Sequence, residues 1–198
     1  MKINIRSNIK EFTKNIKHLD KREIPYIQYI AINNTAKRVV EKEKSATRQY
    51  LDKPTPAVQK SIFIKEYAKK GKQIAVMGFR DWAEKFMKLQ IMGGMRSDRT
   101  HVPTPSMHLN KYGNIPGRRT GIIKGKRFFL QQGNTSGVWE IRGSGANKKL
   151  TLLAKLKEST QYDAIFPYFD IAINNAKKII RQEFVNVAKR VYMQKKYK

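Results

Sequence analysis

The spacing of apolar residues first indicates two long helices. Between Tyr26 and about Tyr50, apolar side chains recur every three or four positions, which is typical of a helix with one buried face. Pro25 fits the first turn of this helix, and Pro54 and Pro56 end it. The apolar stripe consists of Tyr29, Ile32, Ala36, Val39 and Val40.

The longest predicted helix covers residues 165–198 at the C-terminus. Its opposite face and tail are basic. Its apolar stripe consists of Ile173, Ala176, Ile180, Phe184, Val187 and Val191. Two shorter helices are predicted. One spans residues 7–19, with Ser7 as its N-cap, and the other begins after Asp81 and runs to Gln90.

Five segments have the β-branched and aromatic composition of strands. Ser61–Ala68 and Lys72–Phe79 flank Lys69-Lys70-Gly71 and predict a hairpin. A second hairpin is predicted from Ile122–Gln131 and Gly137–Arg142, with residues 132–136 as its turn, and Leu150–Leu156 follows as a fifth strand. The pattern predicts an α+β fold, in which a small antiparallel β-sheet packs against two long amphipathic helices.

Residues 92–121 are expected to form a long irregular arm, because their glycines and prolines interrupt both helices and central strands. A connection of this length is normally functional or disordered, and its apolar residues argue against plain disorder. We therefore expect the arm to pack on neighbouring subunits or proteins. The candidate subunit contacts are Met95, Val102, Met107, Leu109, Tyr112 and Ile115.

Composition narrows the possible partners. The 198 residues predict a single α+β domain over 1–198, with the arm as an extension. A net charge of +27, from 42 Lys and Arg against 15 Asp and Glu, makes self-repulsion strong unless a polyanion or an acidic partner surface neutralises it, although codon bias is a second source of lysine excess. Nucleic acid, an anionic membrane and acidic proteins all remain candidates. Neither a signal peptide nor a membrane span is evident, so we expect a soluble chain made in a cytoplasm.

The sequence offers no catalytic, metal or cofactor site. It has no cysteine, and His18, His101 and His108 do not match a metal-binding spacing. The few acids suggest no general acid–base pair. No phosphate-binding or dinucleotide fingerprint occurs either, because Gly143-Ser144-Gly145 has no third glycine and opens no helix. We therefore expect a non-enzymatic protein without cofactors.

Nucleic-acid binding is compatible with the basic composition but lacks a motif. The basic arm and the basic C-terminal helix would suit phosphate contacts. Aromatic residues in the predicted strands would suit stacking on bases, although such residues more often belong to a core. They are Phe128, Phe129, Trp139 and Tyr162. No helix-turn-helix spacing, RNP-like motif or zinc finger is present.

Three short motifs resemble the minor tail protein Z family of phages, whose members are tail-completion or head–tail joining proteins. The helix segment AINNTAKRV, from Ala31 to Val39, resembles that family's N-terminal half. The block Gly137–Arg142, followed by a glycine tip, a strand and a final helix, resembles its second half. The arm motif Leu109–Pro116 is similar to a segment of phage-encoded homologues.

The resemblance implies a structural virion protein at the tail or head–tail interface, made in the host cytoplasm and assembled as a homo-oligomeric ring around the DNA path. Its partners would be other tail or connector proteins, with non-specific contact to genomic DNA. The cations expected to face the lumen are Arg96, Arg99, Arg118, Arg119, Lys124 and Lys126. The basic cluster at Lys189–Lys198 is the competing DNA site.

Two other functions remain open. One is a free, basic nucleic-acid-binding protein. The other, a membrane-surface protein, is disfavoured because neither long helix sets a Trp/Phe-rich face against a purely basic one.

Overall fold

The chain forms two compact units, as seen in a computed structural model that describes residues 2–5, 23–115 and 127–196. The first unit combines residues 1–91 with 165–198, and we call it the helical unit. The second unit covers residues 92–164, and we call it the sheet unit. The expected α+β class with antiparallel sheets is confirmed. Among the described residues, the strands after residue 92 pair only with one another.

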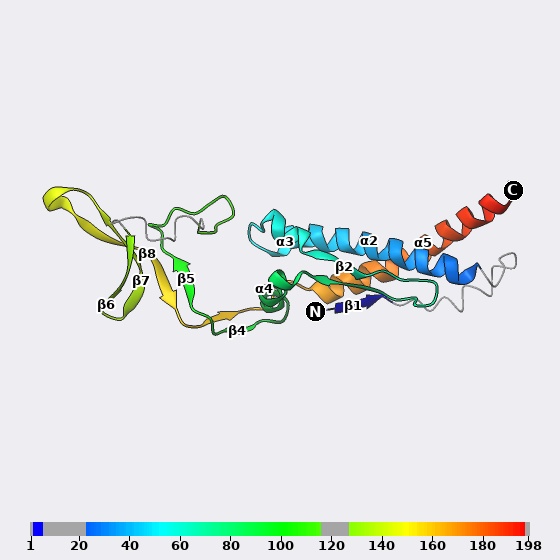
Figure 1. The fold of residues 1–198 in the computed structure, drawn as a ribbon, viewed down its shortest axis with the longest axis horizontal. Helices are drawn as coiled ribbons and strands as arrows, with labels where there is room; N and C mark the ends of the chain where they lie inside the picture. The colour runs from blue at the N-terminus through cyan, green and yellow to red at the C-terminus, as the bar shows by residue number, and fades with distance from the viewer. Residues whose placement is uncertain (1, 6–22, 116–126, 197–198) are drawn as a thin grey trace. The chain divides into compact units, whose positions relative to one another are not determined.

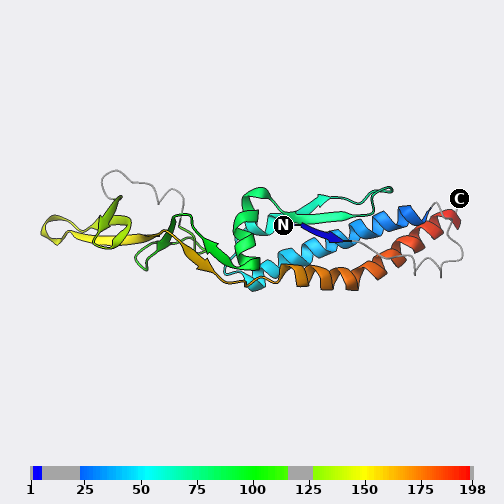
Figure 2. The same ribbon diagram turned by 90° about the horizontal axis from the view of Figure 1, so that it is seen from below.

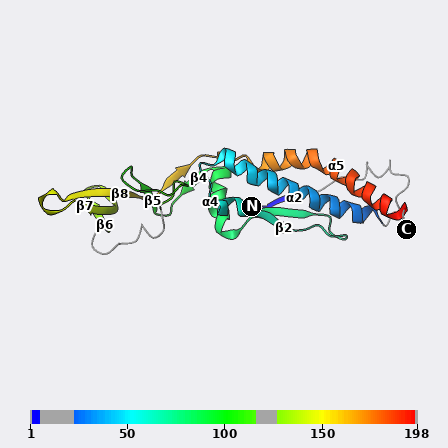
Figure 3. The same ribbon diagram turned by 90° about the horizontal axis from the view of Figure 1, so that it is seen from above.

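The helical unit contains both predicted long helices. Helix α2 spans Ile24–Tyr50, with Pro25 in its first turn, and helix α5 spans Tyr168–Lys196. The two helices pack along each other (Figures 1 and 3). The short helix α3, Pro56–Lys60, follows the α2 terminus, and α4 spans Asp81–Met92 with acids in its first turn, where they suit the helix dipole. The helix predicted over residues 7–19 lies outside the described residues.

A three-stranded antiparallel sheet completes the helical unit. The predicted hairpin is confirmed, with β2 at Ile62–Glu66 and β3 at Ala75–Phe79. Strand β1, Lys2–Ile5, was not predicted, and it pairs with the other edge of β3 to give the order β1-β3-β2. All five residues of β3 are buried. The continuous apolar run AVMGF is what a central strand covered on both faces requires.

Aromatic packing and one amide fasten α2, α5 and the hairpin together. The Tyr168 ring lies 4.8 Å from the Phe79 ring and 5.9 Å from the Phe166 ring, measured between centroids. Asn33 of α2 binds the backbone of Ala68 at both ends of its amide. Its Nδ2 donates to the Ala68 carbonyl at 3.0 Å, and its Oδ1 accepts from the Ala68 N–H at 2.7 Å. Asn33, the first asparagine of the AINN motif, therefore stabilises the hairpin.

The sheet unit contains the remaining strands in two antiparallel sheets (Figure 2). Four strands follow the order β5-β8-β7-β6, and β4 pairs with β9. The 3-10 turn η1, Gly145–Asn147, joins β7 to β8. The bounds are β4 Gly94–Arg96, β5 Thr100–Pro103, β6 Arg127–Gln132, β7 Thr135–Arg142, β8 Lys149–Lys157 and β9 Thr160–Tyr162.

Several expectations about this unit were wrong in detail. The five predicted strands do not share one sheet, because β2 and β3 pair in the helical unit while β6, β7 and β8 pair in the sheet unit. The described part of the arm, 92–115, is not wholly irregular, since β4 and β5 lie within it. Runs of three and four residues are too short to show a strand period. The β6–β7 turn is tighter than residues 132–136, with only Gly133-Asn134 between the paired strands.

The two units differ sharply in how much apolar surface they bury. Both clusters of buried apolar side chains among the described residues belong to the helical unit. In the described part of the sheet unit, the buried apolar side chains are Met107, Val138, Leu153 and Ala154. The sheet unit is therefore held chiefly by strand pairing and polar contacts.

The buried carboxyl of Glu43 gives a testable pH dependence. Glu43 is fully buried on α2, and neither of its carboxyl oxygens has a hydrogen-bond partner among the described residues. Burial raises the pKa of this carboxyl to about 8. Burial also raises the pKa of the Tyr168 hydroxyl, with a further contribution from the charge of Glu43.

We expect the free energy of unfolding to fall as pH rises from about 4.5, where the unfolded chain releases this proton, to about 8, where the folded chain does. The slope from this group approaches about 1.4 kcal/mol per pH unit. Glu43→Gln should remove that contribution, because glutamine does not titrate. Urea unfolding of both proteins between pH 5 and 8 measures it. Parallel curves for the two proteins would contradict the assignment.

Gly137 gives a second prediction, because no side chain fits at its position on β7. A Cβ atom there would lie 2.2 Å from the carbonyl oxygen of Ala154 and 2.9 Å from Cδ1 of Leu152. Gly137→Ala should destabilise the sheet unit by about 2 kcal/mol or more, because the β7–β8 pairing must shift. Gly71→Ala is the matched control, since nothing lies within 4 Å of a Cβ at that position.

Deuterium uptake by the amides of residues 127–157 separates the two variants. Gly137→Ala should accelerate exchange there, and Gly71→Ala should not. Equal uptake in the two variants would show that the close approach of β7 and β8 is unimportant.

Candidate interaction surface of the sheet unit

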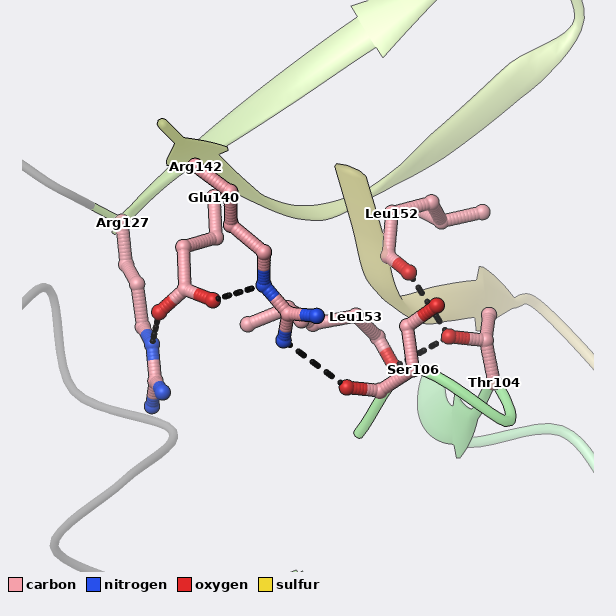
Figure 4. A network of polar contacts seen from close by, with 7 residues as sticks. All are labelled: Thr104, Ser106, Arg127, Glu140, Arg142, Leu152 and Leu153. Carbon is pink, nitrogen blue, oxygen red and sulfur yellow. Dashed lines mark hydrogen bonds and ion pairs between the residues drawn. The ribbon is translucent and has the colours of Figure 1, made fainter. Parts of the chain in front are cut away.

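A carboxylate on β7 pairs with two arginines of the sheet unit (Figure 4). Glu140 receives a hydrogen bond from Nε of Arg127 at 2.8 Å and another from Nε of Arg142 at 2.7 Å. The Arg142 and Arg127 hydrogen bonds hold the pKa of this carboxyl below its ordinary value. Both arginines were absent from the predicted set of surface cations. Arg127 and Glu140 are directly opposite on β6 and β7, so this ion pair also fixes the strand register.

The same network ties part of the expected arm to the sheet (Figure 4). Nη2 of Arg142 donates to the carbonyl oxygen of Ser106 at 2.9 Å. The hydroxyl of Thr104 donates to the β8 carbonyls of Leu152 and Leu153, at 2.7 and 3.0 Å. Residues 104–107 are therefore bound to their own unit.

The motif Leu109–Pro116 contains a turn closed by its own asparagine. Oδ1 of Asn110 accepts from the backbone N–H groups of Tyr112 and Asn114, at 2.9 and 3.0 Å. The Asn114 carbonyl accepts from the Asn110 N–H, and Gly113 adopts a positive φ of 73°. Glycine is the residue that tolerates this conformation best. The composition of this motif is thus explained by a local turn.

The candidate subunit contacts fall into different environments. Met107 is 6% exposed and buried within the sheet unit, so it does not present a contact surface as expected. Met95 is 68% exposed and is open to a partner. The others are only partly exposed in the described structure: Val102, Leu109, Tyr112 and Ile115.

The candidate lumen cations are only partly described. Arg96 lies on β4, with its Nε 3.6 Å from Oδ2 of Asp98, so a carboxylate partly neutralises it. Arg99 is exposed between β4 and β5. The other four lie outside the described residues: Arg118, Arg119, Lys124 and Lys126.

The structure adds exposed lysines that were missing from the predicted set. Lys155 and Lys157 on β8 pair with Val102 and Thr100 of β5. Because successive residues of a strand point to opposite faces, these two lysines share a face. Lys148 and Lys149 are exposed where β8 begins. The alternation in AKLK could have identified the first pair from sequence.

The four aromatic residues considered for stacking on bases also differ in how exposed they are. Phe128 lies opposite Trp139, whose indole N–H donates to the Leu130 carbonyl at 3.0 Å. Tyr162 pairs with Gly94 in the β4–β9 ladder and is partly exposed. Phe129 differs from these three because its side chain is 54% exposed on β6. It is the aromatic of this set most available to a partner.

Neither a metal centre nor a membrane-spanning helix is found among the described residues. They contain no group of three or more His, Asp or Glu side chains placed to hold a metal ion. None of the described helices has both the length and the apolar character needed to span a membrane.

The chain was also compared with known proteins. No protein-family model, curated protein or solved structure matches it.

Proposed function

We propose that this protein is a structural virion protein of a tailed bacteriophage, which forms a ring at the tail or head–tail interface around the DNA path. The observation that carries the proposal is the contrast between the two units. Among the described residues, the helical unit contains both buried apolar clusters, whereas the sheet unit buries only four apolar side chains. A subunit that completes its burial on assembly has this character.

The charge supports the same proposal. A chain with a net charge of +27 repels its own copies unless a polyanion or an acidic surface lies beside it. DNA in a conduit supplies such a surface along its whole length. Contacts from lysine and arginine to phosphate carry no sequence information, so the ring would tolerate any genome sequence. The sequence motifs that resemble the minor tail protein Z family are the reason for proposing a position at the tail or head–tail interface.

The proposed role needs no catalysis or cofactor. Other tail or connector proteins would be the protein partners, and assembly would begin in the host cytoplasm. The competing function is a free nucleic-acid-binding protein, which would bind DNA as an isolated monomer.

We predict that the purified full-length protein forms closed rings at high concentration and moderate salt, because salt screens the repulsion between cationic copies. Negative-stain electron microscopy with light scattering measures this assembly. Uniform rings with a central channel are the expected result. A protein that stays monomeric at every salt concentration, yet binds duplex DNA, would replace this function with the competing one.

We further predict that the exposed lysines of β8 contribute to DNA binding. Lys155→Gln combined with Lys157→Gln should reduce the slope of log K against log salt by roughly 0.9 for each phosphate that the variant no longer neutralises. The matched control replaces Lys85 and Lys88, two exposed lysines of α4, with glutamine. Fluorescence anisotropy with a labelled duplex gives the slopes. Equal slopes in the two double variants would remove β8 from the DNA-facing surface.

A further inference from the structure

The outer edge of β6 is open among the described residues. The order β5-β8-β7-β6 places β6 at the end of its sheet, and no described strand pairs with its other side. A two-residue turn closes the β6–β7 hairpin, so Gln132 and Thr135 form a hydrogen-bonded pair. Hydrogen-bonded and non-bonded pairs then alternate. The backbone groups of Arg127, Phe129 and Gln131 therefore point outward, away from β7.

The opposite edge of the same sheet is protected. The Thr104 N–H donates to the Leu153 carbonyl at 2.9 Å, so Thr104 faces β8. By alternation, Pro103 faces the outer side of β5, where its missing N–H interrupts any further ladder. Proline on an outward position is a recognised way to prevent edge pairing.

The β6 edge lacks this protection. Its sequence, RFFLQQ, contains no proline and no lysine, although the chain has 42 lysines and arginines. Its one cation, Arg127, makes a 2.8 Å ion pair with Glu140. The side chain of Phe129, midway between Arg127 and Gln131, is 54% exposed. An edge whose one cation is neutralised and whose central residue is an exposed aromatic allows a second strongly cationic chain to approach.

We infer that the outer edge of β6 docks a second copy of this chain, whose own β6 pairs with it antiparallel across a two-fold axis at Phe129. This register places the two Phe129 rings beside each other as a cross-strand aromatic pair. It also places Arg127 of each copy opposite Gln131 of the other, so no two arginines face each other. The outward backbone groups of Phe129 and Gln131 in each strand gain ladder partners.

The β6 contact rests on the proposed function in one respect, because the second copy is taken to be a subunit of the same assembly. A two-fold contact joins copies in pairs, whereas a ring closes through head-to-tail contacts. The β6 contact therefore joins two free subunits, or two rings face to face. It leaves the ring-closing contact to other surfaces.

A single engineered cysteine tests the contact, because the natural chain has none. In the inferred register the two residues at position 129 form a hydrogen-bonded pair, with Cα atoms about 5.5 Å apart. This separation is within the range that a disulfide spans. The full-length Phe129→Cys protein should therefore form a disulfide-linked dimer under mild oxidation.

Ile141→Cys is the matched control, because residue 141 is also partly exposed but lies on the central strand β7. It should cross-link at least tenfold more slowly than Phe129→Cys. Equal rates at the two positions would overturn the inferred contact.

The register is tested by changing the charge opposite Arg127. Gln131→Glu should strengthen dimerisation and Gln131→Lys should weaken it, each by several-fold, because the substituted side chain faces Arg127 of the second copy. The same two changes at Gln161, exposed on β9, control for net charge. Sedimentation equilibrium measures the dimer constants, and circular dichroism confirms folding. Matching effects at positions 131 and 161 would overturn the register.

The outcome is separable from that of the proposed function. Rings that persist while Phe129→Cys fails to cross-link would overturn the β6 contact and leave the virion proposal standing. Cross-linked dimers that never assemble into rings would support the β6 contact and contradict the ring.

Discussion

The packing of α2 and α5 against the buried strand β3 is the interaction on which the rest of the chain depends. This packing gathers the apolar side chains of two distant sequence segments, because the chain leaves the helical unit after residue 91 and returns to it at residue 165. Phe166 and Tyr168 mark the return, with both rings fully buried against the unit. The sheet unit is thus an insertion whose two ends start and finish at one core.

The sheet unit has to be stabilised by other interactions than the apolar packing that holds the helical unit. Residues 92–164 contain few buried apolar side chains among those described, so hydrogen bonds and ion pairs carry more of the structure. Glu140 joins two arginines from neighbouring positions of the sheet, and Thr104 fastens the segment that follows β5 to β8. Such contacts define geometry well but bury little surface. They leave side chains such as Met95 and Phe129 available to other molecules.

The sequence was most informative where a period extended over many residues. The stripes of α2 and α5 span several turns, and both helices were predicted to within a few residues. Strands β4, β5 and β9 were missed because three or four residues do not establish a two-residue period. The division of the described strands among three sheets was also missed, because strand order depends on pairing partners that no local pattern specifies.

The candidate surface was less predictable than the fold. Counting cations drew attention to Arg96 and Arg99, but the β7 carboxylate that organises Arg127 and Arg142 could not be identified without the strand register. Met107 resembled an exposed anchor in sequence and is buried. The edge position of β6 was equally unpredictable, since RFFLQQ has a composition that suits a central or an outer strand. For β5, Pro103 was a local signal, because proline favours an edge.

We propose that the sheet unit, rather than the helical unit, makes contact with other molecules. Hydrogen–deuterium exchange followed by mass spectrometry, compared between dilute and assembled full-length protein, would locate this contact. Assembly should slow exchange in the sheet unit, above all over residues 127–131, and leave α2 and β3 unchanged. Slower exchange confined to α2 and α5, with the sheet unit unaffected, would contradict it.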